Sequence, residues 1–179
     1  MTIETLIEVV PPPAAPSEAF SGPWEPIEAA LGKALPQDYK DFVRLYGLGS
    51  FMEFLWVHVP ESLSPYVRFD AQIRAVRAIF HDYADFDQPL WPTRGGLLVF
   101  GVTDFGDYLF WLTRGPPDEW PVVVWGRGLQ KFEAFECGLT DFLAGIAKNE
   151  IVPEEFPEGE CEYMFRPSSD FPEREDETF

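Results

Sequence analysis

Two carboxylates lie close together in one short segment of the chain, at Asp104 and Asp107 on either side of Phe105-Gly106. Paired carboxylates are the residue type that performs acid–base chemistry or binds a metal ion. Aspartate is also a preferred turn residue beside glycine, and we favour this second interpretation. We therefore expect no metal site at these residues.

Other candidates for catalysis stand alone in the sequence. His58 and His81 are far apart and lie among apolar residues, and a catalytic pair with Cys137 has no motif to support it. The sequence contains no His-Glu-x-x-His, no Cys-x-x-Cys, no phosphate-binding Gly-Lys-Ser/Thr loop and no Gly-x-Ser-x-Gly. We predict a protein that is not an enzyme and uses no cofactor. The alternative is an enzyme with a convergent carboxylate or histidine site that no motif reveals.

Acidic residues also flank aromatic residues at two predicted hairpin ends. Tyrosine and tryptophan are enriched at protein interfaces, and carboxylates beside them suit a basic partner. Ordinary turn chemistry would produce the same residues and stays open as the alternative. The predicted protein-binding contacts are Asp104, Asp107, Tyr108, Asp118, Glu119 and Trp120.

The charge of the chain restricts its partners. Thirty-one acidic residues oppose 13 basic ones, which gives a formal net charge of −18, and residues 150–179 are the most acidic region. Nucleic acid is an unsuitable partner, because binding phosphates needs lysine and arginine. A basic protein is favoured, since complementary fields speed association. Solubility alone is the alternative explanation of the charge.

Length and composition indicate one globular domain. The chain has 179 residues, of which 46% are hydrophobic, enough for a core of its own. No apolar run approaches the ~20 residues of a membrane span, and no basic region followed by an apolar one supports export. Two cysteines do not make a disulfide framework. We therefore expect a cytoplasmic protein with reduced thiols and no membrane association.

The strands that must position these residues lie between Leu97 and Glu136. Short runs of β-branched and aromatic residues alternate with turns at 104–107 and 115–118, a pattern typical of antiparallel strands. Gly106 is able to adopt the positive φ that a hairpin turn requires. Both faces of the strands are apolar, so this meander needs covering elements on both sides or a partner.

Helices are indicated by proline and glycine at their ends and by the spacing of their apolar residues. Proline opens and glycine closes the first two predicted helices, and Tyr39, Phe42, Val43 and Tyr46 form one apolar stripe on the second. Asp38 in its first turn suits the helix dipole. Thr140 is the predicted N-cap of the last helix. The predicted elements outside the meander are helices over 24–32, 36–46, 70–83 and 138–148, and a strand over 51–59.

The two ends of the chain differ in composition from its middle. Residues 1–23 are rich in proline and predict an extended segment, preceded by apolar residues that form either an edge strand or a small helix. Residues 150–179 are rich in proline and glutamate, with aromatic residues that either pin this extension to the domain or leave it mobile. We divide the chain into a proline-rich segment (1–23), a domain (24–149) and an acidic extension (150–179).

The order of several motifs resembles a known family, the SUKH superfamily of Smi/Knr-like proteins. The block Leu35-Pro36-Gln37-Asp38-Tyr39-Lys40, followed by Tyr46-Gly47-Leu48-Gly49, is similar to the opening of that family. Phe100 to Trp111 resembles its Gly-Asp hairpin, and Gly138 to Leu143 resembles its closing helix. The resemblance implies an α+β fold, a single domain in which several α-helices pack on a mostly antiparallel, twisted sheet.

The resemblance also implies a function without catalysis. Many bacterial members are immunity proteins that neutralise polymorphic toxins, often nucleases or deaminases, and a fungal branch regulates cell-wall synthesis through protein contacts. The sequence therefore predicts a non-catalytic protein-binding module, an immunity protein that blocks a basic toxin domain. The alternative is a cytoplasmic adaptor or regulator that binds an endogenous protein.

Overall fold

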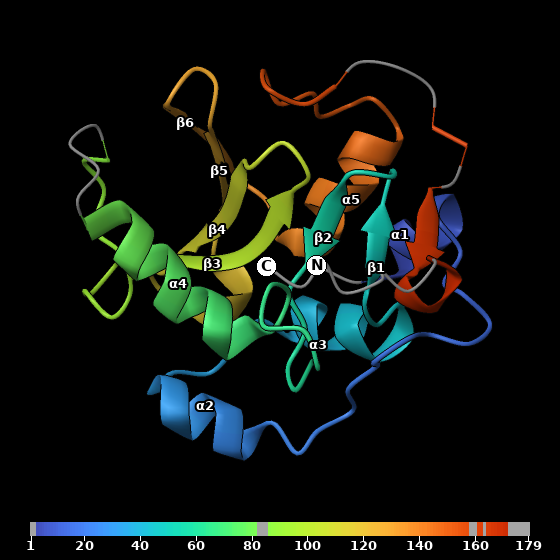
Figure 1. The fold of residues 1–179 in the computed structure, drawn as a ribbon, viewed down its shortest axis with the longest axis horizontal. Helices are drawn as coiled ribbons and strands as arrows, with labels where there is room; N and C mark the ends of the chain where they lie inside the picture. Colours follow the sequence, from blue (N-terminus) through green and yellow to red (C-terminus); the bar gives the residue numbers. More distant parts are fainter. Residues whose placement is uncertain (1–2, 82–85, 158–160, 163, 172–179) are drawn as a thin grey trace, which may run out of the picture.

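The computed structural model describes residues 3–81, 86–157, 161–162 and 164–171 (Figure 1). Its helices are α1 Glu4–Val9, α2 Glu25–Leu31, α3 Gln37–Leu45, α4 Phe69–His81 and α5 Leu139–Ala147. Its strands are β1 Gly49–Phe51, β2 Leu55–Val57, β3 Leu97–Thr103, β4 Tyr108–Leu112, β5 Val122–Gly126, β6 Lys131–Phe135 and β7 Phe165–Pro167. Two short 3-10 helices, η1 Pro117–Glu119 and η2 Ser168–Asp170, complete the described part.

One antiparallel sheet contains all seven described strands, in the order β6-β5-β4-β3-β2-β1-β7. Strands that follow one another in the sequence pair with one another, except that β7 returns to the free edge of β1. Gly106 has a φ of 89° in the turn between β3 and β4, as the hairpin prediction required. The predicted α+β fold and its antiparallel meander are confirmed.

Helices lie on both faces of the sheet, as the apolar meander predicted. On one face, Leu98 and Trp111 belong to a large core shared with α1, α3 and α5. On the other face, Val99 and Phe110 belong to a smaller core with Phe80 of α4. Figure 1 shows α4 on the opposite side of the strands from α1 and α5. Residues that alternate along β3 therefore enter different cores, because successive side chains of a strand point to opposite faces.

The first two predicted helices after the proline-rich segment are confirmed. α2 ends at Gly32, which has a φ of 75° in the left-handed region that favours glycine. The apolar stripe of α3 is buried, as its spacing predicted. α4 begins at Phe69 and is described to His81; the predicted end of this helix near Tyr83 lies outside the described residues.

The single strand predicted over 51–59 is wrong. The structure has a hairpin there, with β1 and β2 joined by a tight turn. Met52 and Glu53 form this turn with φ values of 48° and 67°, in the left-handed region that residues other than glycine rarely adopt. No glycine, proline or asparagine marks the turn, so the sequence carries no signal for it.

The predicted N-cap of α5 is also wrong. Gly138 occupies the N-cap position, and Thr140 lies inside the first turn. The capping acceptor is Asp38 of α3, whose Oδ2 accepts the backbone N–H of Thr140 at 3.1 Å and its hydroxyl at 3.4 Å. Asp38 is buried, and this burial raises the pKa of its carboxyl. Asp38 was expected only to interact with the dipole of its own helix, α3. The structure adds a hydrogen-bonded contact through which Asp38 ties α3 to α5.

Both ends of the chain pack against the domain. α1 forms as a small helix, with Leu6 buried and with the Val10 carbonyl accepting the Tyr46 hydroxyl at 2.5 Å. In the C-terminal part, Phe156 packs 5.2 Å from Phe54, and β7 pairs with β1. Aromatic residues therefore pin the described part of the extension to the domain. Residues 172–179 lie outside the described residues, and the division of the chain into three regions stays a prediction.

Candidate protein-binding surface

The six predicted contact residues lie at the two opposite ends of β4. Asp104, Asp107 and Tyr108 are in and beside the β3–β4 turn, whereas 118–120 lie in the connection from β4 to β5. Successive hairpin connections alternate between the two ends of an antiparallel sheet. The structure therefore does not bring the six residues together into one surface.

Asp107 is a structural residue. Its side chain is 1% exposed and accepts the Thr103 hydroxyl at 2.7 Å and the Arg127 backbone N–H at 2.9 Å. These bonds hold the β3–β4 turn against the β5–β6 turn. A carboxylate that is buried and hydrogen-bonded in this way cannot contact a second protein, so we withdraw Asp107 from the predicted interface.

Trp120 is withdrawn for the same reason. Its side chain is 1% exposed, lies 6.2 Å from Trp111 between ring centroids, and donates its indole N–H to the Gly115 carbonyl at 3.2 Å. The Lys33 ammonium lies 5.2 Å from the Trp120 ring centroid and 5.3 Å from that of Trp91, within cation–π range. Trp120 therefore anchors the β4–β5 connection inside the domain.

Tyr108 is half-buried against α4. Its ring meets Phe80 edge-on at 5.4 Å between centroids, and this burial raises the pKa of its hydroxyl. Asp118 is exposed but also has a structural contact, because its Oδ1 accepts the Gln37 backbone N–H at 2.6 Å at the start of α3. Asp104 and Glu119 are exposed. Three exposed carboxylates and part of one tyrosine therefore stay available to a partner.

Around Asp104 the structure places aromatic residues that the prediction missed. Phe105, at the tip of the β3–β4 turn, is 56% exposed and packs 6.2 Å from Phe54 between ring centroids. Asp104 accepts the indole N–H of Trp56 at 3.0 Å, and Trp56 lies 5.3 Å from the Phe171 ring. An apolar residue at the tip of a turn has no strand partner, and this signal could have identified Phe105.

We call this region the hairpin-end surface and define it by Glu53, Trp56, Asp104, Phe105 and Phe171. Glu53 is exposed in the β1–β2 turn and accepts the backbone N–H of Glu162 at 3.2 Å. The hairpin-end surface thus includes two exposed carboxylates and one exposed aromatic ring. Such an arrangement suits a protein partner that has cations around an apolar hollow.

Two ionisable side chains elsewhere, the buried His58 and the half-buried Cys137, are held in their neutral forms. His58 has no exposed surface, and neither ring nitrogen has a hydrogen-bond partner among the described residues. Burial lowers the pKa of His58 to about 3, and burial raises the pKa of the Cys137 thiol to about 11. A neutral imidazole and an un-ionised thiol are therefore the dominant forms at pH 7.

Searches for two further kinds of site gave negative results within the described part of the chain. No group of three or more His, Cys, Asp or Glu side chains there is arranged to hold a metal ion. No helix among those residues has both the length and the apolar character needed to cross a membrane.

Comparison with known proteins identifies one relationship. The SUKH_6 family model, described as SMI1-KNR4 cell-wall, matches residues 23–143, which is more than half of the chain. Neither the search of curated proteins nor that of solved structures found a match. The matched range runs from just before α2 into α5 and includes the whole β1–β6 sheet.

Proposed function

Because this chain belongs to the SMI1-KNR4 family of the SUKH superfamily, we propose that it is a non-catalytic protein-binding module. More specifically, we propose an immunity protein that neutralises a basic bacterial toxin domain, of nuclease or deaminase type, by blocking it. The observation that carries the proposal is the exposed Phe105 ring beside the exposed Asp104 carboxylate. The hairpin-end surface would be the contact region.

In this proposal, charge and apolar contact contribute to binding at different distances. A chain with a net charge of −18 attracts a basic domain over a long range and speeds its association. Once docked, an aromatic side chain that leaves water contributes most of the short-range affinity. Trp56 holds the Asp104 carboxylate in place through its indole N–H, so little side-chain freedom is lost on binding.

The test first looks for a toxin gene beside the gene of this chain and then uses the toxin domain found there, with growth protection and affinity as the two measurements. Phe105→Ala should weaken binding by about 2 kcal/mol, which is roughly 30-fold, and reduce protection. Asp104→Asn keeps an acceptor for Trp56 while it removes the charge, so it should slow association and flatten its salt dependence.

Leu63 provides the matched control. It is an exposed apolar residue, 92% exposed, in the loop that follows β2, at the end of β2 opposite to Leu55, which pairs with Thr103 beside the β3–β4 turn. Leu63→Ala should leave the affinity unchanged. Equal effects of the Phe105 and Leu63 substitutions would remove the hairpin-end surface from the interface. An absence of any binding to the neighbouring toxin domain would count against the immunity role.

The cell-wall description of the matching family model favours a second candidate function, an adaptor or regulator of an endogenous protein. The same hairpin-end surface would then bind a cellular partner. Affinity purification from the source organism distinguishes the two, because a regulator should recover a chromosomal housekeeping protein whose binding depends on Phe105. An immunity protein should instead recover a secreted toxin.

A further inference from the structure

A second surface lies far from the hairpin ends, in a groove between α2 and α4. The groove has a volume of about 500 Å³. From α2 it is lined by Ile27, Ala30 and Leu31, and from α4 by Ile73, with Trp91 at one end. We call this the α2–α4 groove. Its lining is mostly apolar, which is the character of a surface that holds another side chain.

α2 itself is weakly packed on the domain. None of its residues is buried, and Figure 1 shows it standing apart from the sheet, below α4. Ile27 and Leu31 touch the large core but stay half-buried. Amphipathic helices are normally stabilised by burying their apolar face. The apolar face of α2 is therefore only partly covered within the described structure.

The groove continues beyond Phe69 toward the loop before α4. A second hollow of about 320 Å³ shares Ile27, Phe69 and Asp70 with the first and reaches Pro60 and Glu61. The two hollows together make an elongated trough. An elongated trough suits a stretch of polypeptide better than a compact small molecule.

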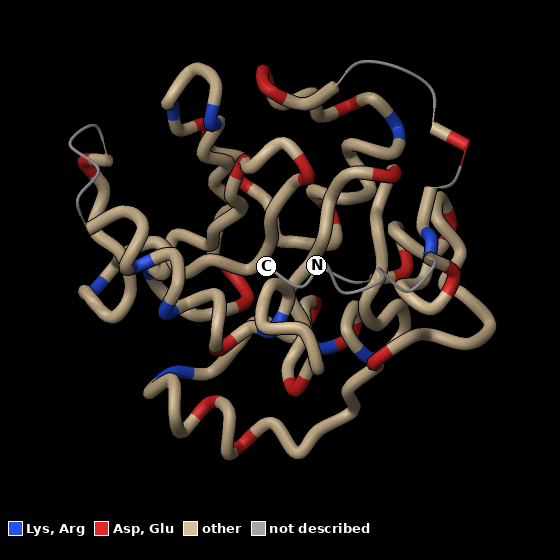
Figure 2. The backbone as a smooth tube through the Cα atoms, viewed as in Figure 1, with Lys and Arg blue, Asp and Glu red and all other residues tan. Residues whose placement is uncertain are grey.

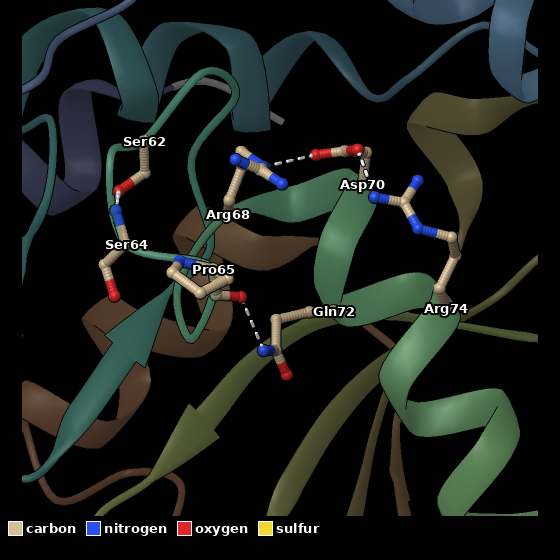
Figure 3. A network of polar contacts seen from close by, with 7 residues as sticks. All are labelled: Ser62, Ser64, Pro65, Arg68, Asp70, Gln72 and Arg74. Carbon is tan, nitrogen blue, oxygen red and sulfur yellow. Dashed lines mark hydrogen bonds and ion pairs between the residues drawn. The ribbon is translucent and has the colours of Figure 1, made fainter.

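The loop that borders this end is held in one conformation by polar contacts (Figure 3). Ser62 Oγ accepts the Ser64 backbone N–H at 3.2 Å, and the Gln72 side-chain amide donates to the Pro65 carbonyl at 2.9 Å. Two large apolar side chains in this loop are nevertheless exposed, Leu63 at 92% and Tyr66 at 79%. An ordered loop that presents such side chains to water is typical of an interaction surface.

The charges along the groove are mainly positive, although the chain as a whole is strongly acidic. Asp70 pairs with two guanidinium groups, of Arg68 at 3.0 Å and of Arg74 at 2.7 Å (Figure 3). Arg77 also lines the groove and forms no ion pair with any described residue. Lys33 lies at the other end, over Trp91. Figure 2 shows Lys and Arg, drawn in blue, along α4 and on the chain that follows α2.

Glu28 of α2 does not cancel this charge. Glu28 is engaged by Lys40 at 2.5 Å and accepts the Leu35 backbone N–H at 2.8 Å. These contacts lower the pKa of Glu28 against the opposing effect of burial. Glu28 is therefore committed to the α2–α3 connection, and the excess of cations in the groove is left for a ligand.

We propose that the α2–α4 groove binds a short acidic segment of a partner protein that carries one large apolar side chain. The apolar side chain would lie on Ile27, Ile73 and Trp91, and the acidic side chains would pair with Arg74 and Arg77. Cations around an apolar floor are complementary to this kind of segment. The proposal goes beyond the proposed function, because it concerns another surface and a partner of opposite charge.

The probe is a phage-displayed library of random peptides of about 12 residues, a length that spans such a groove. The full chain is the bait, and peptides that also bind an Ala30→Trp variant are discarded, because an indole at position 30 fills the groove. We expect the remaining peptides to be rich in Asp and Glu around one large apolar residue. Recovery of neutral or basic peptides would overturn the proposal.

Affinities of the selected peptides then test the charges. Arg77→Glu should weaken binding by at least about tenfold. Lys148→Glu makes the same change of charge at an exposed residue after α5 and should have little effect. Equal effects of the two substitutions would mean that only the net charge of the protein affects peptide binding. That result would overturn the proposal that the α2–α4 groove is the binding site. Circular dichroism of each variant checks that the fold is retained.

A synthetic peptide of residues 172–179 is the second probe, because this segment is acidic and ends in Phe179. We expect it to displace the selected peptides only weakly, since the terminal carboxylate beside its phenylalanine opposes burial of the ring. Displacement at a comparable concentration would assign the groove to the chain's own C-terminal segment. That result would overturn the proposal of a separate partner.

Discussion

The buried imidazole of His58 should make the stability of this protein depend on pH in a predictable way. The side chain has no exposed surface, and its two ring nitrogens have no partner among the described residues. Only the backbone of His58 is engaged there: its carbonyl accepts the Tyr39 hydroxyl at 2.8 Å, and its N–H donates to the Phe100 carbonyl at 2.7 Å. Protonation of the ring would bury an uncompensated charge, so the folded protein resists it.

The size of the effect follows from linkage. Burial lowers the pKa of His58 to about 3 from an ordinary value of 6.5. Below about pH 6.5 the unfolded chain takes up a proton that the folded chain does not, so the free energy of unfolding falls as the pH falls toward 3. Between about pH 7.5 and pH 5 the loss attributable to His58 should be about 2 kcal/mol. Above pH 7.5 this group contributes no pH dependence.

The assay is urea unfolding of the wild type and of His58→Leu at both pH values. Leucine is similar in size and removes both unpaired nitrogens, so at pH 7.5 the variant should be within about 1 kcal/mol of the wild type or more stable. On going from pH 7.5 to pH 5, the free energy of unfolding of the variant should rise by about 2 kcal/mol relative to that of the wild type. His81 is present in both proteins and cancels in the comparison.

A difference between the two proteins that stays the same at both pH values would refute this reasoning. It would mean that the folded protein accepts the proton on His58 as readily as the unfolded chain does. The ring would then have a partner or solvent access that its burial does not suggest. A variant that fails to fold at pH 7.5 would also contradict the expectation, and His58→Gln would then separate loss of packing from loss of the titratable group.

Two further substitutions test contacts that only the fold creates. Asp38→Ala should lower the free energy of unfolding by about 2 kcal/mol, measured in urea, because the N–H and hydroxyl of Thr140 lose their buried acceptor; a loss below about 0.5 kcal/mol would show that Asp38 does not cap α5. Gly47→Ala should cost several kcal/mol, because a Cβ there would overlap the Ser17 carbonyl oxygen at a φ of 65°. Gly32→Ala, at a φ of 75° with open space around it, should cost only about 1 kcal/mol, and similar melting temperatures for the two glycine variants would contradict the clash.

Elements with local signals were predictable from the sequence. Proline and glycine mark the ends of α2 and α3, and the turn residues Asp104 and Gly106 mark the β3–β4 hairpin. Proline fixes its own φ and glycine permits a positive φ, so the signal does not depend on distant contacts. The hairpin of β1 and β2 had no such mark, because Met52 and Glu53 are driven into their turn by the pairing of the strands.

The sequence did not show which of the predicted interface residues reach solvent, because this depends on which face or end of a strand each residue occupies. Asp107 and Trp120 have the composition of surface contacts, yet both are 1% exposed. When both faces of a sheet are apolar, alternation along a strand does not show which side chains reach solvent. Phe105 reaches solvent at a turn tip, although most of the large side chains that are fully buried in the described structure are also aromatic.

The amino-acid sequence by itself determined the α+β class, the antiparallel meander and the family, because these depend on local periodicity, turn residues and the order of motifs along the chain. Only the tertiary structure decided that Asp38 caps α5 from 102 residues away, that β7 closes the edge of β1, and that an arginine-lined groove separates α2 from α4. Contacts of this kind join residues distant in the sequence. No local pattern encodes such partners, and the packing of the whole chain selects them.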